Sequence, residues 1–159
     1  MHVLLLSITL ALSPLRAQSA PTVLKVAGDV TTALSLSAAD IKAMPRATVE
    51  IKEENRTVAY EGVRVSDILK KAAGGSADLR SYPLTTYVVM TASDGYQIVF
   101  SIGELDPGLT ANDIIVADTV DGKPLFAYQG SWRVVAPKDL RGARSLRMLE
   151  RIEVVRLKK

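Results

Sequence analysis

The stretch that decides the fold runs over residues 130–154 and reads GSWRVVAPKDLRGARSLRMLERIEV. A glycine turn leads into the only tryptophan of the chain, Trp132, with Arg133 beside it. The apolar run that follows predicts a short strand over 132–135, and a basic turn then leads into a last strand over 152–157. The residues alone leave two interpretations of the Trp–Arg pair open. Either the pair closes a core, or it holds a flat polar ligand.

Upstream of this stretch, the pattern predicts many short strands and few helices. Asp94-Gly95 and Asp121-Gly122 each separate apolar runs, as in hairpin turns, because glycine adopts positive φ without a steric penalty. Short helices are predicted after the candidate N-caps Ser37 and Ser66. These elements indicate a mixed α+β domain. Strands are predicted over residues 23–27, 47–53, 56–62, 87–90, 98–100 and 114–117.

Composition excludes several kinds of site. The chain has 159 residues, of which 48% are hydrophobic, enough for one packed domain. It contains no cysteine, which excludes disulfides, thiolate metal sites and a cysteine nucleophile. Its single histidine, His2, precedes the predicted domain, so that domain has neither of the favoured zinc ligands and no Ser-His-Asp triad. No GxGxxG, P-loop or GxSxG motif occurs.

The first residues predict export. Residues 3–12 form an apolar run of the length found in signal peptides, and Pro14 and small residues follow it. We expect a signal peptide over 1–20, one domain over 21–159, and a periplasmic or secreted protein without membrane insertion after cleavage. The whole chain has a net charge of +3; loss of Arg16 leaves 19 basic against 17 acidic residues, or +2. This small excess does not indicate nucleic-acid binding.

Some polar residues are candidate site residues by position. Asp94 and Tyr96 lie in a predicted hairpin turn, although Asp-Gly is also ordinary turn chemistry. Asp118 directly follows an apolar strand, which places its carboxylate near a strand end. Basic residues also recur at three- and four-residue steps, as on one face of a helix. Such a face is either a solvated surface or a docking stripe for an acidic partner or a phosphate. The stripe consists of Arg141, Arg144, Arg147 and Arg151.

A family resemblance emerges from the order of several stretches. YEGVRVSDILKKAAG, TASDGYQIVFSIGELD, IIVADTVDGKPL and GSWRVVAPKDLRGARSLRMLERIEV follow one another along the chain. Together, over roughly residues 22–157, they resemble the molybdopterin-binding domain of sulfite-oxidase-type oxidoreductases. The resemblance implies a compact α+β fold with mostly antiparallel sheets and a few short helices.

The chain departs from the enzymes of that family at two places. Those enzymes bind molybdenum through a cysteine in the loop after the strand that resembles residues 47–53, where this chain has Glu53-Glu54-Asn55. They often carry GxPxR where this chain has GSWR, which is one residue shorter: Gly130 and an arginine, Arg133, are kept, and Trp132 stands in the proline's place. A carboxylate does not simply substitute for a thiolate, because soft and hard ligands suit different metal states.

The chain is most similar to small exported members that lack the cysteine. The resemblance implies a regulator that binds free pterins and signals to the periplasmic domain of a membrane-bound enzyme that makes or degrades cyclic di-GMP. Two alternatives stay open. One is an oxidoreductase whose molybdenum cofactor is held without a thiolate. The other is a ligand-free interaction domain that binds its partner through Arg141, Arg144 and Arg147.

The chemistry of a pterin suggests which side chains hold it. A pterin is flat and polar along one edge, so an aromatic ring can stack on it and a carboxylate can pair with its amino group and ring N–H. Trp132 or Tyr96 is expected to stack, and Arg133 to donate to a ligand oxygen. The carboxylate is left open among Asp94, Asp118 and Glu104. No catalytic residue and no metal ligand is assigned.

Overall fold

The computed structural model describes residues 22–53, 55–75 and 78–158. The predicted leader over residues 1–20, and Glu54, lie outside the described residues. None of the helices in the described part of the chain is long and apolar enough to cross a membrane.

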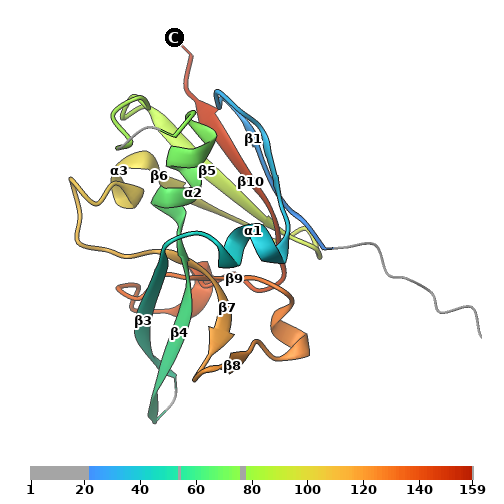
Figure 1. Cartoon of the computed structure of the whole chain (residues 1–159). Coiled ribbons are helices and arrows are strands. Elements are labelled where there is room, and N and C mark those ends of the chain that lie inside the picture. The colour runs from blue at the N-terminus through green and yellow to red at the C-terminus, as the bar shows by residue number, and fades with distance from the viewer. Residues whose placement is uncertain (1–21, 54, 76–77, 159) are drawn as a thin grey trace, which may run out of the picture.

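Two sheets form the frame of the molecule, one above the other in Figure 1. The first has the strand order β2-β1-β10-β5-β6, and the second has the order β3-β4-β7-β8 with β9 also paired to β7. All pairs are antiparallel except β1 with β10. The mixed α+β architecture with mostly antiparallel sheets is therefore confirmed. The elements are β1 (Leu24–Gly28), β2 (Leu34–Leu36), α1 (Ala38–Lys42), β3 (Arg46–Glu53), β4 (Arg56–Arg64), α2 (Val65–Ala72), β5 (Thr86–Ala92), β6 (Gln97–Ser101), α3 (Ile102–Leu105), β7 (Ile115–Val120), β8 (Lys123–Pro124), η1 (Ala127–Gln129), β9 (Arg133–Val135), η2 (Gly142–Arg144) and β10 (Leu149–Arg156).

The first and last strands are hydrogen-bonded neighbours inside the upper sheet. Lys25 to Gly28 of β1 run parallel to Arg151 to Val154 of β10. Gly28 has φ +94°, and a Cβ at this position would lie 2.1 Å from the carbonyl oxygen of Val154. Only glycine permits this approach. The backbone N–H of Asp29 then donates to the same oxygen at 2.8 Å.

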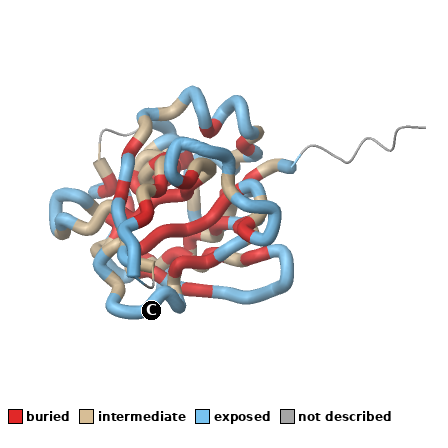
Figure 2. The backbone as a smooth tube through the Cα atoms, turned by 90° about the horizontal axis from the view of Figure 1, so that it is seen from below, coloured by how far each residue is buried: buried red, intermediate tan, exposed pale blue. Residues whose placement is uncertain are grey.

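Apolar side chains form two clusters. The larger cluster joins the upper sheet, α2 and β9, and it contains Trp132, Phe100 and Leu69. The smaller one packs on the other face of the lower sheet and contains Tyr60 and Val135. Alternation along β9 explains the division, because Val134 points into the larger cluster and Val135 into the smaller one. Buried backbone accordingly runs through the middle of Figure 2, and exposed loops surround it.

Of the two predicted helix caps, one is confirmed and one is wrong, and the last strand starts earlier than predicted. Ser37 caps α1 in a reciprocal capping box with Asp40. The prediction that Ser66 is an N-cap is wrong, because α2 starts one residue earlier and Ser66 is buried inside it. Strand β4 runs directly into α2, and the N–H of Val65 donates to the Ile114 carbonyl. The last strand starts at Leu149, three residues earlier than predicted, because its N–H pairs with the Trp132 carbonyl at 2.9 Å.

Candidate functional site

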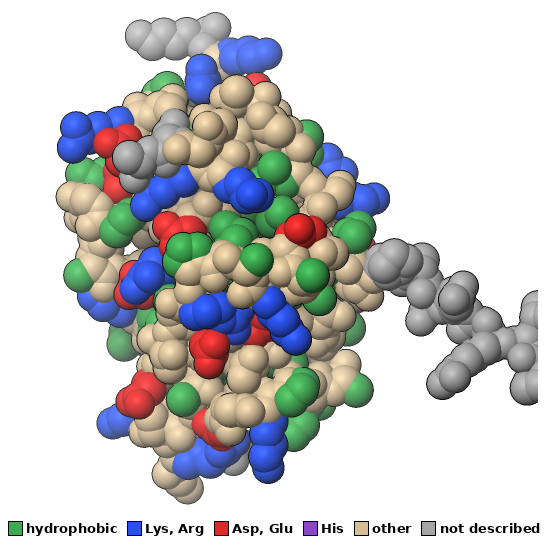
Figure 3. Space-filling model, in the orientation of Figure 1, with side chains coloured by type: hydrophobic (Ala, Val, Ile, Leu, Met, Phe, Trp, Pro, Cys, Tyr) green, Lys and Arg blue, Asp and Glu red, His purple; other side chains and the backbone are tan. Residues whose placement is uncertain are grey.

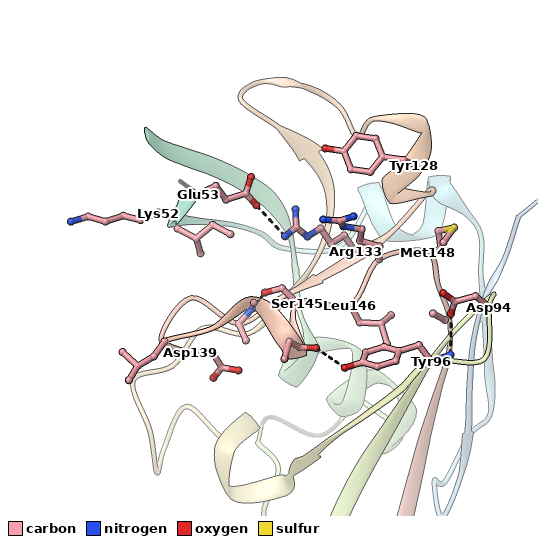
Figure 4. Close-up of a pocket in the computed structure, with 17 residues that line it drawn as sticks. Lys52, Glu53, Asp94, Tyr96, Tyr128, Arg133, Asp139, Ser145, Leu146 and Met148 are labelled. Atoms are coloured by element: carbon pink, nitrogen blue, oxygen red, sulfur yellow. Dashed lines mark hydrogen bonds and ion pairs between the residues drawn. The ribbon is translucent and has the colours of Figure 1, made fainter. Parts of the chain in front are cut away.

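A cavity of about 740 Å³ lies where the ends of the two sheets meet. The end of β3 contributes Lys52 and Glu53, the β5–β6 turn contributes Asp94 and Tyr96, and the segment 136–148 forms a further wall. Tyr128 and Arg133 complete the lining, as Figure 4 shows. The volume falls within the range of pockets for small organic ligands.

Met148 connects two of these walls through its backbone. Its N–H donates to the Gln129 carbonyl at 2.7 Å, and its carbonyl accepts from the N–H of Ser93 at 2.9 Å. Gly130, with φ +79°, permits this contact, because a Cβ there would lie 2.8 Å from the Met148 Cα. The turn that carries Tyr128 is thereby fixed relative to the hairpin turn that carries Asp94.

Arg133 is the most deeply buried charge of the cavity, with 6% of its surface exposed. Its Nη2 lies 3.1 Å from Glu53 Oε1, and its Nη1 donates to the Tyr60 hydroxyl. The guanidinium also lies over the Tyr60 ring, 4.7 Å from the centroid. Its Nε is buried without a hydrogen-bond partner among the described residues. The side chain is therefore held by Glu53 and Tyr60, and its Nε–H is left unused.

Tyr60 is the centre of a buried polar network behind Arg133. Its hydroxyl donates to Glu53 Oε1 at 3.0 Å and accepts from Gln129 Nε2 at 3.2 Å. Burial raises the pKa of Tyr60, and the positive charge of Arg133 opposes that rise only in part. The phenol thus stays protonated at neutral pH and orients Glu53 toward Arg133.

Asp94 and Tyr96 form the opposite wall. Asp94 Oδ1 accepts the backbone N–H of Tyr96 at 2.9 Å, which fixes the turn. The Tyr96 hydroxyl donates to the Ala143 carbonyl at 3.2 Å, so the ring spans from the hairpin to the 136–148 wall (Figure 4). Tyr96 is 53% exposed. The structure therefore places Asp94 and Tyr96 with Arg133 in one cavity, with an aromatic face open to a ligand.

An aromatic stack borders the cavity on the side of η1. The rings of Phe126 and Tyr128 are 5.7 Å apart and nearly parallel, and more than half of each residue is exposed. The Arg147 guanidinium lies 5.2 Å from the Tyr128 centroid. Arg147 has no carboxylate partner among the described residues. Tyr128 and Arg147 both line the cavity.

Trp132, in contrast, belongs to the core. It is 1% exposed, packs in the larger apolar cluster and does not line the cavity. Trp132 therefore closes the core, whereas the position of Arg133 fits a residue that holds a ligand. Successive residues of an extended chain point to opposite sides, which separates these two neighbours.

Asp118 and Glu104 also lie outside the cavity lining. Both Asp118 oxygens accept from Arg46, across the lower sheet. Burial by itself would raise the pKa of Asp118, but the hydrogen bonds from Arg46 and Thr119 outweigh it and lower the pKa. Glu104 closes the capping box of α3 with Ser101 and pairs with Arg144 at 2.8 Å. Of the three carboxylates left open by the sequence, only Asp94 faces the cavity.

The predicted arginine stripe is not formed. The segment is mostly turns with one short 3₁₀ helix, so the three- and four-residue spacing puts these residues on no common helical face. Arg144 is bound by Asp139 and Glu104 and lies over the Phe100 ring, and its pKa is raised chiefly by the hydrogen bond to Asp139. Arg151 lies in β10. Arg141 and Arg147 remain exposed. On the face in Figure 3, basic and acidic side chains are interspersed.

Sequence reasoning missed Tyr128, which lines the cavity, and also Tyr60 and Gln129, which form the polar network behind Arg133. Tyr60 looked like an ordinary strand residue, and Tyr128 and Gln129 lie in a turn with no motif. The contact between Tyr60 and Arg133 joins residues 73 positions apart. Glu53 carried one usable signal, since it stands where the related enzymes have the loop with their cysteine.

Comparisons with known proteins fit this geometry. Residues 51–159 match the family model of the oxidoreductase molybdopterin binding domain. The chain belongs to this family. No curated protein matches it. Among solved structures, the chain is similar to the sulfane dehydrogenase SoxCD from Paracoccus pantotrophus, with a TM-score of 0.65 and 18% sequence identity. The match covers 83% of this chain and 37% of that one, so the chain spans just over a third of the length of the SoxCD chain.

The residues present do not fit a thiolate-bound molybdenum centre. The chain has no cysteine, and the end of β3 instead presents Glu53, whose Oε1 is already bound by Arg133 and Tyr60. Among the described residues, no three His, Cys, Asp or Glu side chains gather in a metal-binding cluster. The cavity offers carboxylates that accept hydrogen bonds, an aromatic face and a guanidinium that donates, which suit the organic part of such a cofactor.

Proposed function

We propose that the chain is an exported pterin-binding module rather than a molybdenum enzyme. The observation that carries the proposal is the pairing of Glu53 with Arg133 and Tyr60 at the end of β3, beside a cavity that stays open. A ligand ring would stack on Tyr96, Asp94 would pair with its amino group and ring N–H, and Arg133 would donate to a ring oxygen.

The proposal also includes a signalling step that follows pterin binding. By the resemblance to small exported family members, the bound pterin would signal to the periplasmic domain of a membrane-bound cyclic-di-GMP enzyme. The exposed Arg141 and Arg147 and the aromatic pair of Phe126 and Tyr128 border the cavity wall and are the surface available for such a partner. Arg144 is a poor contact residue for that purpose, because two carboxylates already bind it.

Native mass spectrometry tests the proposal against its alternatives. The full chain is produced in a host that makes the molybdenum cofactor and is purified gently after export. We expect a bound mass that matches a pterin without metal. A molybdenum-bearing mass would instead support the oxidoreductase. A bare chain that also binds no added pterin would support the interaction domain, which the burial of Trp132 in the core favours.

Substitution of Asp94 tests the binding residues. We expect Asp94→Asn to weaken binding of 6-hydroxymethylpterin, followed by its fluorescence, about tenfold, because a charge-assisted hydrogen bond becomes a neutral one. Asp106→Asn is the matched control. Asp106 Oδ1 accepts a backbone N–H at 2.9 Å within its own turn, as Asp94 does, but Asp106 does not line the cavity. Equal effects of the two substitutions would contradict the assignment of Asp94.

A further inference from the structure

Arg133 is a buried cation whose charge is already matched inside the protein. Arg133 is only 6% exposed, so its guanidinium has lost most of its hydration and needs an anion nearby. Glu53 supplies that anion at 3.1 Å, and the Tyr60 hydroxyl donates to the same carboxylate oxygen, Oε1. A ligand anion is therefore not required to neutralise this side of the cavity.

The charges of the whole cavity lining also balance. Three cations line it, namely Lys52, Arg133 and Arg147, and three carboxylates, namely Glu53, Asp94 and Asp139, so the formal sum is 3 − 3 = 0. Behind Asp139, the charges of Arg144 and Glu104 cancel each other. Lys52 and Arg147 are exposed, so water screens them more than it screens Arg133.

Glu53 also has a second carboxylate oxygen that is free to accept a hydrogen bond from a ligand. Both of its contacts, from Arg133 and from Tyr60, go to Oε1. Its Oε2 accepts no hydrogen bond from the described residues, and Glu53 lines the cavity (Figure 4). The carboxylate therefore favours a ligand that donates N–H or O–H groups at this end, and it repels one that brings negative charge.

We propose that Glu53 is the charge-selectivity residue of this cavity, restricting it to uncharged pterins and excluding those with an acidic side chain or an anionic metal centre. This inference rests on the proposed pterin binding and names the class of pterin. An acidic ligand would have to break the pair of Glu53 with Arg133 or place its negative charge beside the Glu53 Oε2, which accepts no hydrogen bond from the described residues.

The test compares two ligands that differ in charge. Binding of 6-hydroxymethylpterin, which is uncharged at neutral pH, and of pterin-6-carboxylate, which carries one negative charge, is measured by calorimetry on the exported chain. We expect the wild type to prefer the uncharged ligand by about tenfold or more, the effect of roughly 1.4 kcal/mol. Glu53→Gln should shift the ratio by about tenfold toward the carboxylate.

Glu50→Gln is the matched control, since Glu50 lies on the same strand, is exposed and does not line the cavity. It should leave the ratio unchanged. A ratio that is the same in wild type and Glu53→Gln, or a wild type that prefers the carboxylate, would overturn the inference while leaving pterin binding intact. If neither ligand binds the wild type, the proposed function fails and this inference with it. Should Glu53→Gln not fold, the wild-type preference alone decides.

Discussion

Two arginines show how one residue type takes two roles in this molecule. Arg46 reaches across the lower sheet to Asp118 and Glu61 and makes a structural contact among residues that do not line the cavity. Arg133 makes a similar ion pair with Glu53, but does so on the wall of the cavity. The difference lies in the surroundings of each pair, because only the second faces space that a ligand can fill.

For the ion pair of Asp118 with Arg46, we predict that Asp118→Asn lowers the stability of the fold in a pH-dependent way. The pKa of Asp118 lies below its ordinary value of 3.8, so its ionised form stabilises the fold above that pH and this contribution is lost as the pH falls through the lowered pKa. The variant should lose about 1–2 kcal/mol at pH 7, measured by urea unfolding. The difference from wild type should shrink between pH 4 and pH 2.

Asp78→Asn serves as the comparison, because Asp78 pairs with Arg80 at an exposed site. It should change the free energy of unfolding by less than about 0.5 kcal/mol. A difference between Asp118→Asn and wild type that stays constant down to pH 2 would show that the ionised carboxylate is not what stabilises the sheet.

Of the two serines predicted as helix caps, Ser37 caps its helix and Ser66 lies inside its helix. Ser37 accepts the N–H of Asp40, and the Asp40 carboxylate accepts the Ser37 N–H in return. Ser66 sits within the first turn of α2, buried, while Arg64 occupies the cap position without a side-chain hydrogen bond. A cap residue needs an extended backbone before the helix, and strand β4 supplies that at Arg64 instead.

Alanine substitutions should separate these two serines. Ser37→Ala is expected to lower the free energy of unfolding by about 1 kcal/mol, since the first turn of α1 loses its reciprocal bonds. Ser66→Ala should change it by less than about 0.5 kcal/mol, because no cap is lost. Guanidinium unfolding curves of both variants supply the measurement. If both variants lose the same free energy of unfolding, Ser66 acts as a cap and α2 does not start at Val65.

For the whole molecule, the contact of the first strand with the last is decisive. Strand β10 lies between β1 and β5, so residues from both ends of the domain complete the upper sheet. Residues from two parts of the chain far apart in sequence must meet before this sheet exists, which makes folding depend on non-local pairing. The close approach at Gly28 is one place where that meeting is sterically demanding.

Gly28→Ala should therefore destabilise the entire domain. A methyl group would strike the Val154 carbonyl and the residue would keep a positive φ, so we expect a loss of at least about 2–3 kcal/mol in thermal or denaturant unfolding. Gly142→Ala is the control, because no atom lies within 4 Å of a Cβ there. An unchanged melting temperature in Gly28→Ala would refute the close packing of β1 on β10.

Much of the architecture was predictable from local signals. The hairpins at Asp94-Gly95 and Asp121-Gly122, the cap at Ser37 and the family were all visible as patterns of neighbouring residues. The site was less predictable. Asp94, Tyr96 and Arg133 were expected in it and do line one cavity, whereas Trp132, Asp118 and Glu104 lie outside it. Each of these three has a structural role that depends on a distant contact, with the core, with Arg46 and with Arg144.

The sequence by itself determined the α+β class, the turns and the absence of a thiolate ligand, because these depend on composition and on short-range backbone preferences. Only the tertiary structure decided which way Trp132 and Arg133 point, which carboxylate stays open to a ligand, and that Glu53 binds Arg133. Those outcomes depend on which side of a strand faces the core and on ion pairs between residues far apart in the chain. Local spacing carries no information about either until the two sheets have met.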